Sequence, residues 1–321
     1  MSNENRPHVV LLGAGASIAV LNDFNGADKN GKKLSVMNNF IQELGLSGIF
    51  EKYGYKTKFS NLEDIYSELY QRAELKGLRT ELEIAIENYF FELELPEQPT
   101  IYDMLILSLT KKDCIATFNW DPLIVQAFLR IRKITNDIPE ILYLHGNVFI
   151  GFCKTDKRYG LHNGACEICH RHYDSIPILY PVMHKNYNQN EAIESFWRKF
   201  KSKLSEAYIF TIFGYSAPKS DKDAVESIKN NWNLSMQSLE QLEIIDIKSR
   251  NELDETWKDF KFESHYNYCK SFYESILSRF PRTSVESLVR QNEYAEFLDD
   301  KPKFHSNMNW SEISELSNSK K

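Results

Sequence analysis

The 321-residue sequence has no excess of positive charge: 39 lysines and arginines stand against 45 acidic residues, for a net charge of −6. This balance gives no support for general nucleic-acid binding, which depends on cationic contacts to phosphates. Long apolar runs are also missing. The longest, residues 207–213, is far shorter than the roughly 20 residues of a membrane-spanning helix. With no basic-then-apolar leader visible, we expect a cytoplasmic protein without membrane contact.

Cysteine is scarce as well, and its placement is uneven. Five cysteines, three of them within residues 153–169, do not make the disulfide framework of a secreted protein. The composition, 42% apolar and 26% charged, is that of an ordinary globular protein. A chain of this length can bury a sizeable core as one large domain or two smaller ones.

The most informative segment present is residues 8–17 (HVVLLGAGAS), where an apolar run leads directly into a glycine turn. Gly13 allows a tight turn, and Gly15 allows backbone amides to approach a pyrophosphate at a helix N-terminus. The dehydrogenase fingerprint has a third glycine three residues after the second, where this chain has Ile18. The turn therefore predicts dinucleotide binding and disfavours hydride transfer.

Apolar strand-like runs alternate with helical patterns along most of the chain. Strands are predicted at 113–117, 141–144, 178–180, 208–213 and 242–247, and helices at 122–134, 191–204 and from about 220. This alternation predicts an α/β fold, a Rossmann-like parallel sheet with helices on both faces.

The expected domain organisation is a catalytic domain over residues 1–250 and a helical extension with a frayed tail over 251–321. Within the first, residues 62–95 read as a helical insertion, begun by a capping box from Ser60, and residues 147–177 as a small Cys/His module. A second capping box is predicted at Thr283. The polar residues 22–33 are expected to form a loop over the ligand site.

Small or polar residues follow five of the predicted strands, at the sheet edge where open parallel sheets bind ligands. They are Gly13–Ser17, Thr117 with Asn119 and Asp121, His145, Gly214 with Ser216, and Asp246. Each has a simpler interpretation. Asn119 and Asp121 could cap a helix, His145 or Gly214 could belong to an ordinary turn, and Asp246 could be a cap or a surface acid. Their order and spacing favour one shared site.

This ordered set resembles the sirtuin-like family of NAD-consuming proteins over about residues 8–247. The matching residues are the phosphate-binding turn (Gly13, Ala14, Gly15, Ser17), Asp23 with Phe24, the nicotinamide-pocket motif (Thr117, Asn119, Asp121), the catalytic-histidine motif (His145) and the later nucleotide-contacting turn (Gly214, Ser216). Sirtuin deacylases carry an arginine where this chain has Asn25 and a glutamine where it has Phe118. The chain looks more like the divergent bacterial branch of NAD hydrolases that acts in anti-phage defence.

The resemblance implies an NAD glycohydrolase that releases nicotinamide and ADP-ribose, with NAD as its substrate. Backbone amides of Gly13 to Ser17 would hold the phosphates, Asn119 would orient the carboxamide or the attacking water, and Asp121 would support the developing positive charge. His145 would act as the base, and Asp246 could hold the adenosine ribose. Activity would be gated by a homo-oligomer, a sensor or an ATPase partner. Two alternatives remain: an NAD-dependent protein deacylase, and a module that senses NAD or ADP-ribose without cleaving it.

The Cys/His module could hold zinc. Sirtuins carry a four-cysteine zinc module soon after the His-Gly motif, and here Cys153, Cys166 and Cys169 follow it. A histidine, His162, His170 or His172, would complete a tetrahedral site, and we expect His172 to be the fourth ligand. The alternative is a cluster of reduced cysteines with surface histidines.

Overall fold

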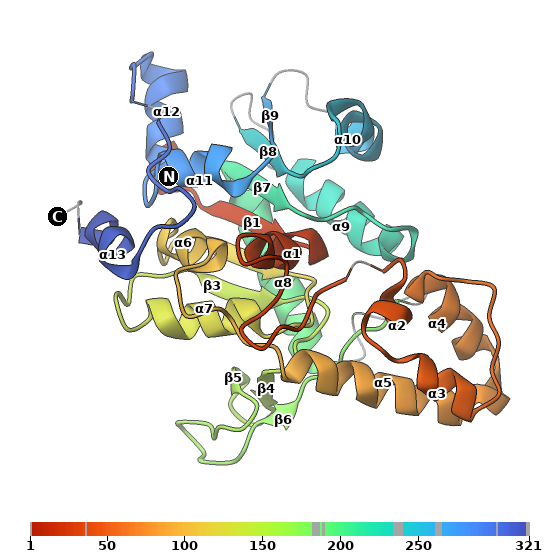
Figure 1. Cartoon of the computed structure of the whole chain (residues 1–321). Coiled ribbons are helices and arrows are strands. Elements are labelled where there is room, and N and C mark those ends of the chain that lie inside the picture. The colour runs from red at the N-terminus through yellow and green to blue at the C-terminus, as the bar shows by residue number, and fades with distance from the viewer. Residues whose placement is uncertain are drawn as a thin grey trace.

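The computed structural model describes residues 2–35, 37–181, 187, 190–233, 240–260, 265–299 and 301–318. Its centre is a six-stranded sheet whose strands are all parallel, in the order β3-β2-β1-β7-β8-β9 (Figure 1). The strands are β1 (His8–Leu12), β2 (Cys114–Thr117), β3 (Glu140–Tyr143), β7 (Ile209–Phe213), β8 (Gln241–Ile245) and β9 (Tyr266–Cys269). The predicted Rossmann-like α/β fold is confirmed.

The strands are nearly continuous apolar runs because helices cover the sheet. All five residues of β1 and of β7 are buried, as expected for a parallel sheet covered on both faces. Helix α6 (Ile101–Leu107) packs against α1 (Ala14–Asn22) and α7 (Leu123–Ile131). Helix α8 (Glu191–Glu206) packs against β2, β3 and α9 (Lys222–Asn233). None of the helices that the structure describes combines the length and apolar character needed to cross a membrane.

The strand order places a topological switch point between β1 and β7. Chain connections run from β1 through β2 to β3 on one side, and from β7 through β8 to β9 on the other. In open α/β sheets, ligands bind outside the carboxyl ends of the strands at such a point. The turns that follow β1 and β7 are therefore where a ligand site is expected.

The helical insertion lies beyond one end of the sheet (Figure 1). The predicted segment 62–95 contains α4 (Leu62–Gln71) and α5 (Lys76–Phe91), and two short helices that the prediction did not include, α2 (Phe40–Glu43) and α3 (Ser47–Lys52), precede it. The apolar residues predicted for one face of α4 are buried, namely Leu62, Ile65, Tyr66 and Leu69. The cap differs by one residue from the prediction: the Asn61 side chain, rather than that of Ser60, accepts from the Glu63 amide at 2.8 Å.

The small module is an antiparallel sheet of the order β5-β4-β6, made of β4 (Ile150–Cys153), β5 (Arg158–Leu161) and β6 (Asp174–Ser175). The strand expected at 178–180 does not form. Instead, the Leu179 amide donates to the carbonyl of His145 at 2.9 Å. The chain that leaves the small module is thereby bonded to His145, which lies just before the module.

The region after residue 250 differs from the helical extension that the sequence predicts. It contains helices α10 (Arg250–Trp257), α11 (Ile276–Arg279), α12 (Ser284–Tyr294) and α13 (Trp310–Asn318), but also β9, which pairs with β8. Thr283 is the N-cap residue of α12 without a side-chain cap bond, so the second capping box is not formed. Helix α13 occupies part of the expected frayed tail, and residues 319–321 lie outside the described chain. Within the described residues, short 3-10 helices complete the fold, namely η1 (Asn3–Asn5), η2 (Ala73–Leu75), η3 (Lys219–Asp221), η4 (Lys258–Phe260) and η5 (Phe272–Glu274).

A buried polar chain ties the first strand to this late region. His8 contacts Thr211 Oγ1 through Nε2 at 2.7 Å and Ser284 Oγ through Nδ1 at 2.8 Å. Thr211 in turn donates to Glu243 at 3.3 Å, and Glu243 accepts from the Ile276 amide at 2.9 Å. Burial lowers the pKa of His8 to about 3, so the ring is neutral and both nitrogens can be satisfied by hydroxyls.

Candidate active site

The glycine turns after β1 and β7 touch each other across the switch point. A Cβ added to Gly13 would lie 2.6 Å from the Gly214 carbonyl oxygen, and one added to Gly15 would lie 2.8 Å from Gly214 Cα. Gly214 has a φ of +63°, and its Cβ would lie 2.2 Å from the Ala16 nitrogen. Glycine is needed at all three positions because the backbones approach too closely for any side chain.

The backbone amides of the β1 turn are partly used within the protein. Gly13 donates to the carbonyl of Phe213 at 3.0 Å, Gly15 to that of Gly214 at 2.9 Å, and Ala16 to that of Gly13 at 2.9 Å. Three of the five amides expected to hold phosphates therefore already have protein acceptors. The glycines of this turn serve close backbone packing, and the expected phosphate contacts of Gly13 to Ser17 stay a prediction.

Ser17, Asn119 and Asp121 come together in one buried hydrogen-bond network. Ser17 Oγ donates to Asp121 Oδ2 at 2.7 Å, and the Asn119 amide donates to Ser17 Oγ at 2.9 Å and to the Gly13 carbonyl at 2.9 Å. The Tyr102 hydroxyl bonds to Ser17 at 2.7 Å and to the Asn119 amide at 3.2 Å. None of the four side-chain-bearing residues of this network is more than 6% exposed. Of the five strand ends that were expected to share one site, those of β1 and β2 are thus in direct contact.

Thr117 and Asp121 hold the backbone around Asn119. Thr117 Oγ1 accepts from the backbone N–H of Asn119 at 3.0 Å, and Asp121 Oδ1 accepts from the backbone N–H of Leu123 at 3.1 Å. Asp121 can therefore cap the following helix and belong to the network at the same time. Its Oδ1 accepts from the Leu123 amide at the start of α7, and its Oδ2 accepts from Ser17. Together these bonds fix the orientation of both candidate side chains.

Burial changes the electrostatics of Asp121. Loss of water raises the pKa of its carboxyl to about 6, although bonds from Ser17 and from the Leu123 amide favour the charged form. Burial also raises the pKa of the Tyr102 hydroxyl far above its ordinary value, which keeps it neutral. Asp121 can therefore gain or lose a proton close to neutral pH.

His145 follows β3 and lies beneath aromatic side chains. Its Nε2 is 3.5 Å from the Tyr187 hydroxyl and 3.9 Å from Asp221 Oδ1. The ring of Phe118 lies 4.3 Å from the imidazole centroid, and that of Tyr215 lies 4.7 Å from the ring of Phe118. His145 is 4% exposed, so this cover is nearly complete.

Three polar residues of the site were not predicted from the sequence. Tyr102 comes from α6, whose capping box of Thr100 and Asp103 is legible in the sequence but does not point to a ligand site. The Asn147 amide donates to the Asp121 carbonyl at 2.6 Å, and its place two residues after His145 was an available signal. Asp221 lies seven residues after Gly214, beyond the turn, and no spacing rule led to it.

Other predicted contacts lie apart from this network. Asp23 is exposed and accepts from the Tyr273 hydroxyl at 2.6 Å, Phe24 is half-buried, and Ser216 is exposed. Asp246 accepts from the Lys248 amide at 2.9 Å and lines a cavity of about 290 Å³ at the β8–β9 edge. The lining of that cavity includes none of Ser17, Asn119, Asp121 and His145. A role for these residues in nucleotide binding stays a prediction.

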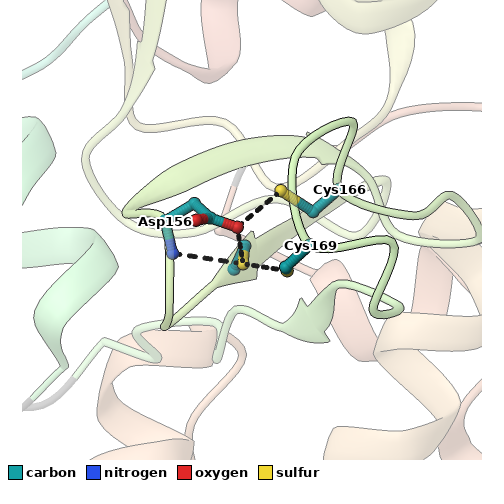
Figure 2. Close-up of side chains that lie close together, drawn as sticks. Asp156, Cys166 and Cys169 are labelled. Atoms are coloured by element: carbon teal, nitrogen blue, oxygen red, sulfur yellow. Dashed lines mark hydrogen bonds between the residues drawn. The ribbon is translucent and has the colours of Figure 1, made fainter.

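A candidate metal site lies in the small module, where three thiols and a carboxylate converge. The ligand atoms of Cys153, Asp156, Cys166 and Cys169 all lie within 4.8 Å of one another. Cys153 Sγ is 3.5 Å from Cys169 Sγ, and Cys166 Sγ is 3.1 Å from Asp156 Oδ2. Figure 2 shows the Asp156 carboxylate pointing toward Cys166 with Cys169 beside it. These separations suit tetrahedral zinc, whose bonds to sulfur are about 2.3 Å and to carboxylate oxygen about 2.0–2.2 Å long.

The fourth member of this cluster is Asp156, where a histidine was expected. His172 is exposed and forms an isolated bridge with Ala165, and His162 Nδ1 lies 3.3 Å from the Ser175 hydroxyl. The antiparallel turn between β4 and β5 brings Asp156 back over Cys153, a proximity that the Cys/His spacing did not reveal. The Asp156 amide donates to Cys153 Sγ at 3.4 Å and lowers the pKa of this thiol, which suits a thiolate ligand.

Comparison with known proteins found matches only among solved structures. No protein-family model and no curated protein matches the chain. A Sir2 homologue in complex with NAD is 15% identical over 90% of each chain, with a TM-score of 0.36. A structure described as the basis for the mechanism and regulation of Sir2 enzymes is 13% identical over 91% of this chain and 95% of that one, with a TM-score of 0.41. Because both TM-scores lie below 0.5, function is argued from this chain's own residues.

Proposed function

We propose that the protein is an NAD hydrolase that cleaves the bond between nicotinamide and ribose. The observation that carries the proposal is the buried network of Ser17, Asn119 and Asp121 at the carboxyl ends of β1 and β2. This network lies beside the switch point of the sheet, where open α/β folds bind nucleotides. The sirtuin-like order of these residues along the chain supports the same substrate.

Asn119 offers a substrate its side-chain oxygen. Its amide nitrogen has two N–H groups and three acceptors within reach, the Gly13 carbonyl and the hydroxyls of Ser17 and Tyr102, which fix the plane of the side chain. The remaining acceptor, Oδ1, suits an N–H of the nicotinamide carboxamide or an O–H of the attacking water. A side chain locked by three contacts can position either one with little entropic cost during the reaction.

Asp121 would stabilise the positive charge that develops on the ribose, and His145 would take the proton of the attacking water. Bond cleavage sends the C1′–N electron pair to nicotinamide and leaves positive charge on the ribose, which the buried Asp121 carboxylate would stabilise. Water then forms the C1′–O bond, and its proton passes to His145 and on to solvent. The balance is NAD plus water to nicotinamide, ADP-ribose and one proton.

Phe118 favours hydrolysis over deacylation. Its ring packs 4.3 Å from the His145 ring and 6.0 Å from Trp197, at the position where sirtuin deacylases carry glutamine. An acyl-lysine that reached His145 would need to displace this aromatic packing, whereas water needs much less room. The proposal therefore places water, not an acylated peptide, as the second reactant.

The covered site fits an enzyme that is inactive at rest. His145, Asn119 and Asp121 are each no more than 6% exposed, and His145 is packed against the rings of Phe118 and Tyr187, so these rings must move before NAD can reach His145. We propose that an oligomer, or a sensor or ATPase partner, drives this movement. An NAD hydrolase held closed until triggered suits a toxic effector of bacterial anti-phage defence.

Product analysis tests the proposal. The purified chain, alone and with the product of its neighbouring gene, is incubated with NAD and separately with NAD plus an acetylated peptide. Nicotinamide and ADP-ribose in equal amounts, with no dependence on the peptide, are expected. O-acetyl-ADP-ribose would instead identify a deacylase, and intact NAD under every condition would favour a sensing module.

A further inference from the structure

Asp221 lies at the end of η3, directly before α9, and faces the candidate base. Its Oδ1 is 3.9 Å from His145 Nε2, and its Oδ2 accepts from the Tyr215 hydroxyl at 3.0 Å. The side chains of His145 and Asp221 are each only 5% exposed. The chain reaches this position through the Gly214 turn, so the segment that packs against the β1 glycines also delivers the carboxylate.

The surroundings favour a charged carboxylate with a neutral hydroxyl beside it. Burial and the nearby Asp221 charge raise the pKa of Tyr215 well above its ordinary value, so this hydroxyl remains a hydrogen-bond donor. Tyr187 also faces His145, and burial raises its pKa in the same direction. The other charges acting on these tyrosines are those of Asp223 and Glu63. The Asp221 carboxylate lies 3.9 Å from Nε2 of the imidazole, and a carboxylate at this distance stabilises an imidazolium.

We propose that Asp221 is a positioning residue for His145. It orients the imidazole from the Nε2 side and stabilises the imidazolium that forms when His145 takes the proton of the attacking water. A buried carboxylate beside a catalytic histidine performs these two tasks in other hydrolases without itself becoming protonated. The role in turnover rests on the proposed function, whereas the coupling between the two side chains is a property of the resting protein.

The test compares Asp221→Asn with Asp223→Asn in the full chain. Asp223 is the matched control because it is an exposed carboxylate two residues later, at the start of α9. The titration of His145 is followed by NMR of the histidine ring protons, with its signal assigned by loss in His145→Gln. We expect Asp221→Asn to lower the titration midpoint by about one pH unit or more and Asp223→Asn to leave it nearly unchanged. An unchanged midpoint in folded Asp221→Asn overturns the proposal.

Turnover gives the second readout. Asp221→Asn is expected to lower kcat by roughly 10- to 1,000-fold with a KM within about twofold, while Asp223→Asn keeps the wild-type kcat. If Asp221→Asn does not fold, Asp221→Glu retains the charge but shifts it by one methylene; it should keep the titration midpoint raised and still lower kcat. Wild-type kcat in either folded Asp221 variant contradicts the positioning role. Absence of NAD cleavage by the wild-type protein, both alone and with the product of its neighbouring gene, refutes the proposed function separately, since the NMR result does not depend on turnover.

Discussion

The side-chain amide of Asn119 donates to the hydroxyl of Ser17 at 2.9 Å, although 102 residues separate the two in the chain. Parallel pairing of β1 with β2 places the ends of the two strands side by side, with Leu12 opposite Thr117. The hydrogen bond therefore joins the helix that starts after β1 to the turn that follows β2. Loss of this bond should therefore affect the stability of the protein as well as the proposed activity.

Asn119→Ala should remove NAD cleavage while leaving a folded protein. We expect kcat to fall by roughly 100- to 1,000-fold, the usual loss when a fixed polar group of a polar transition state is deleted. The free energy of unfolding should fall by about 1–3 kcal/mol because buried partners lose their donor. Turnover and urea unfolding measure both, with exposed Asn88→Ala as the control. Undiminished turnover in both Asn119→Ala and His145→Ala would rule out the assignment of the site.

The activity should decline in mild acid. Because burial raises the pKa of Asp121 to about 6, its carboxylate is lost at a higher pH than that of an exposed aspartate. If the charged form supports the ribose cation, kcat rises with pH through a midpoint near 6. Asp121→Asn should lower kcat and abolish this rise. A wild-type profile that is flat from pH 5 to 7, roughly one unit either side of that midpoint, would contradict this role for Asp121.

The same carboxyl should make stability depend on pH. A raised folded-state pKa means that the protonated form stabilises the protein below the unfolded pKa near 4, and that this contribution is lost as pH rises through about 6. Relative to wild type, Asp121→Asn should therefore gain about 2–3 kcal/mol on going from pH 4 to pH 7. Urea unfolding of both proteins at the two pH values measures this. If the free energies of unfolding of Asp121→Asn and wild type differ by the same amount at pH 4 and at pH 7, the pKa of Asp121 is not raised in the folded protein.

The small module should bind about one zinc ion per chain. Cys166→Ser should lose the metal, and Asp156→Asn should bind it more weakly, because each removes a ligand of the tetrahedral set. His172→Ala is the control and should retain the metal, since its side chain is exposed. Elemental analysis and thermal unfolding with and without a chelator test these expectations. A zinc content under about 0.2 per chain in wild type would rule out the site.

Gly214→Ala should destabilise the protein by more than about 2 kcal/mol. A methyl group at this position would have to fit 2.2 Å from the Ala16 nitrogen and to adopt a φ of +63°. Gly31→Ala measures the free-energy cost of a positive φ without a steric clash, because Gly31 has a φ of +80° but no atom within 4 Å of an added Cβ. This control should lose only about 1 kcal/mol. Equal losses in the two variants would show that the glycine turns are not in close contact.

The features that depend on short-range pattern were predictable. The continuous apolar runs at 8–12 and 209–213 indicated buried parallel strands, and the alternation with helices indicated the fold class. The spacing of polar residues after β1 and β2 was enough to place Ser17, Asn119 and Asp121 near one another. These signals work because parallel strands end at a common edge.

The features that were missed depend on contacts between distant segments. Tyr102 enters the network from a helix whose own sequence pattern reports only its cap. Asp156 reaches the thiols because the turn between β4 and β5 brings it back toward them. Strand β9 pairs with β8, although the sequence Tyr266–Cys269 is too short and too mixed in polarity to predict a strand. The acceptors of the glycine-turn amides were also not legible in the sequence: the Gly13 amide donates to Phe213, that of Gly15 to Gly214, and that of Ala16 to Gly13.

The bond between His8 and Ser284 has a consequence for the order in which the protein can be made. The first strand to leave the ribosome finds its buried partners in Thr211 and in Ser284, which is synthesised 276 residues later. A nascent chain therefore cannot add β9, the last strand of the sheet, before Cys269 is synthesised, and it cannot form the bond between His8 and Ser284 until later still. Burial of the first strand against its latest partner is therefore completed only near the end of synthesis.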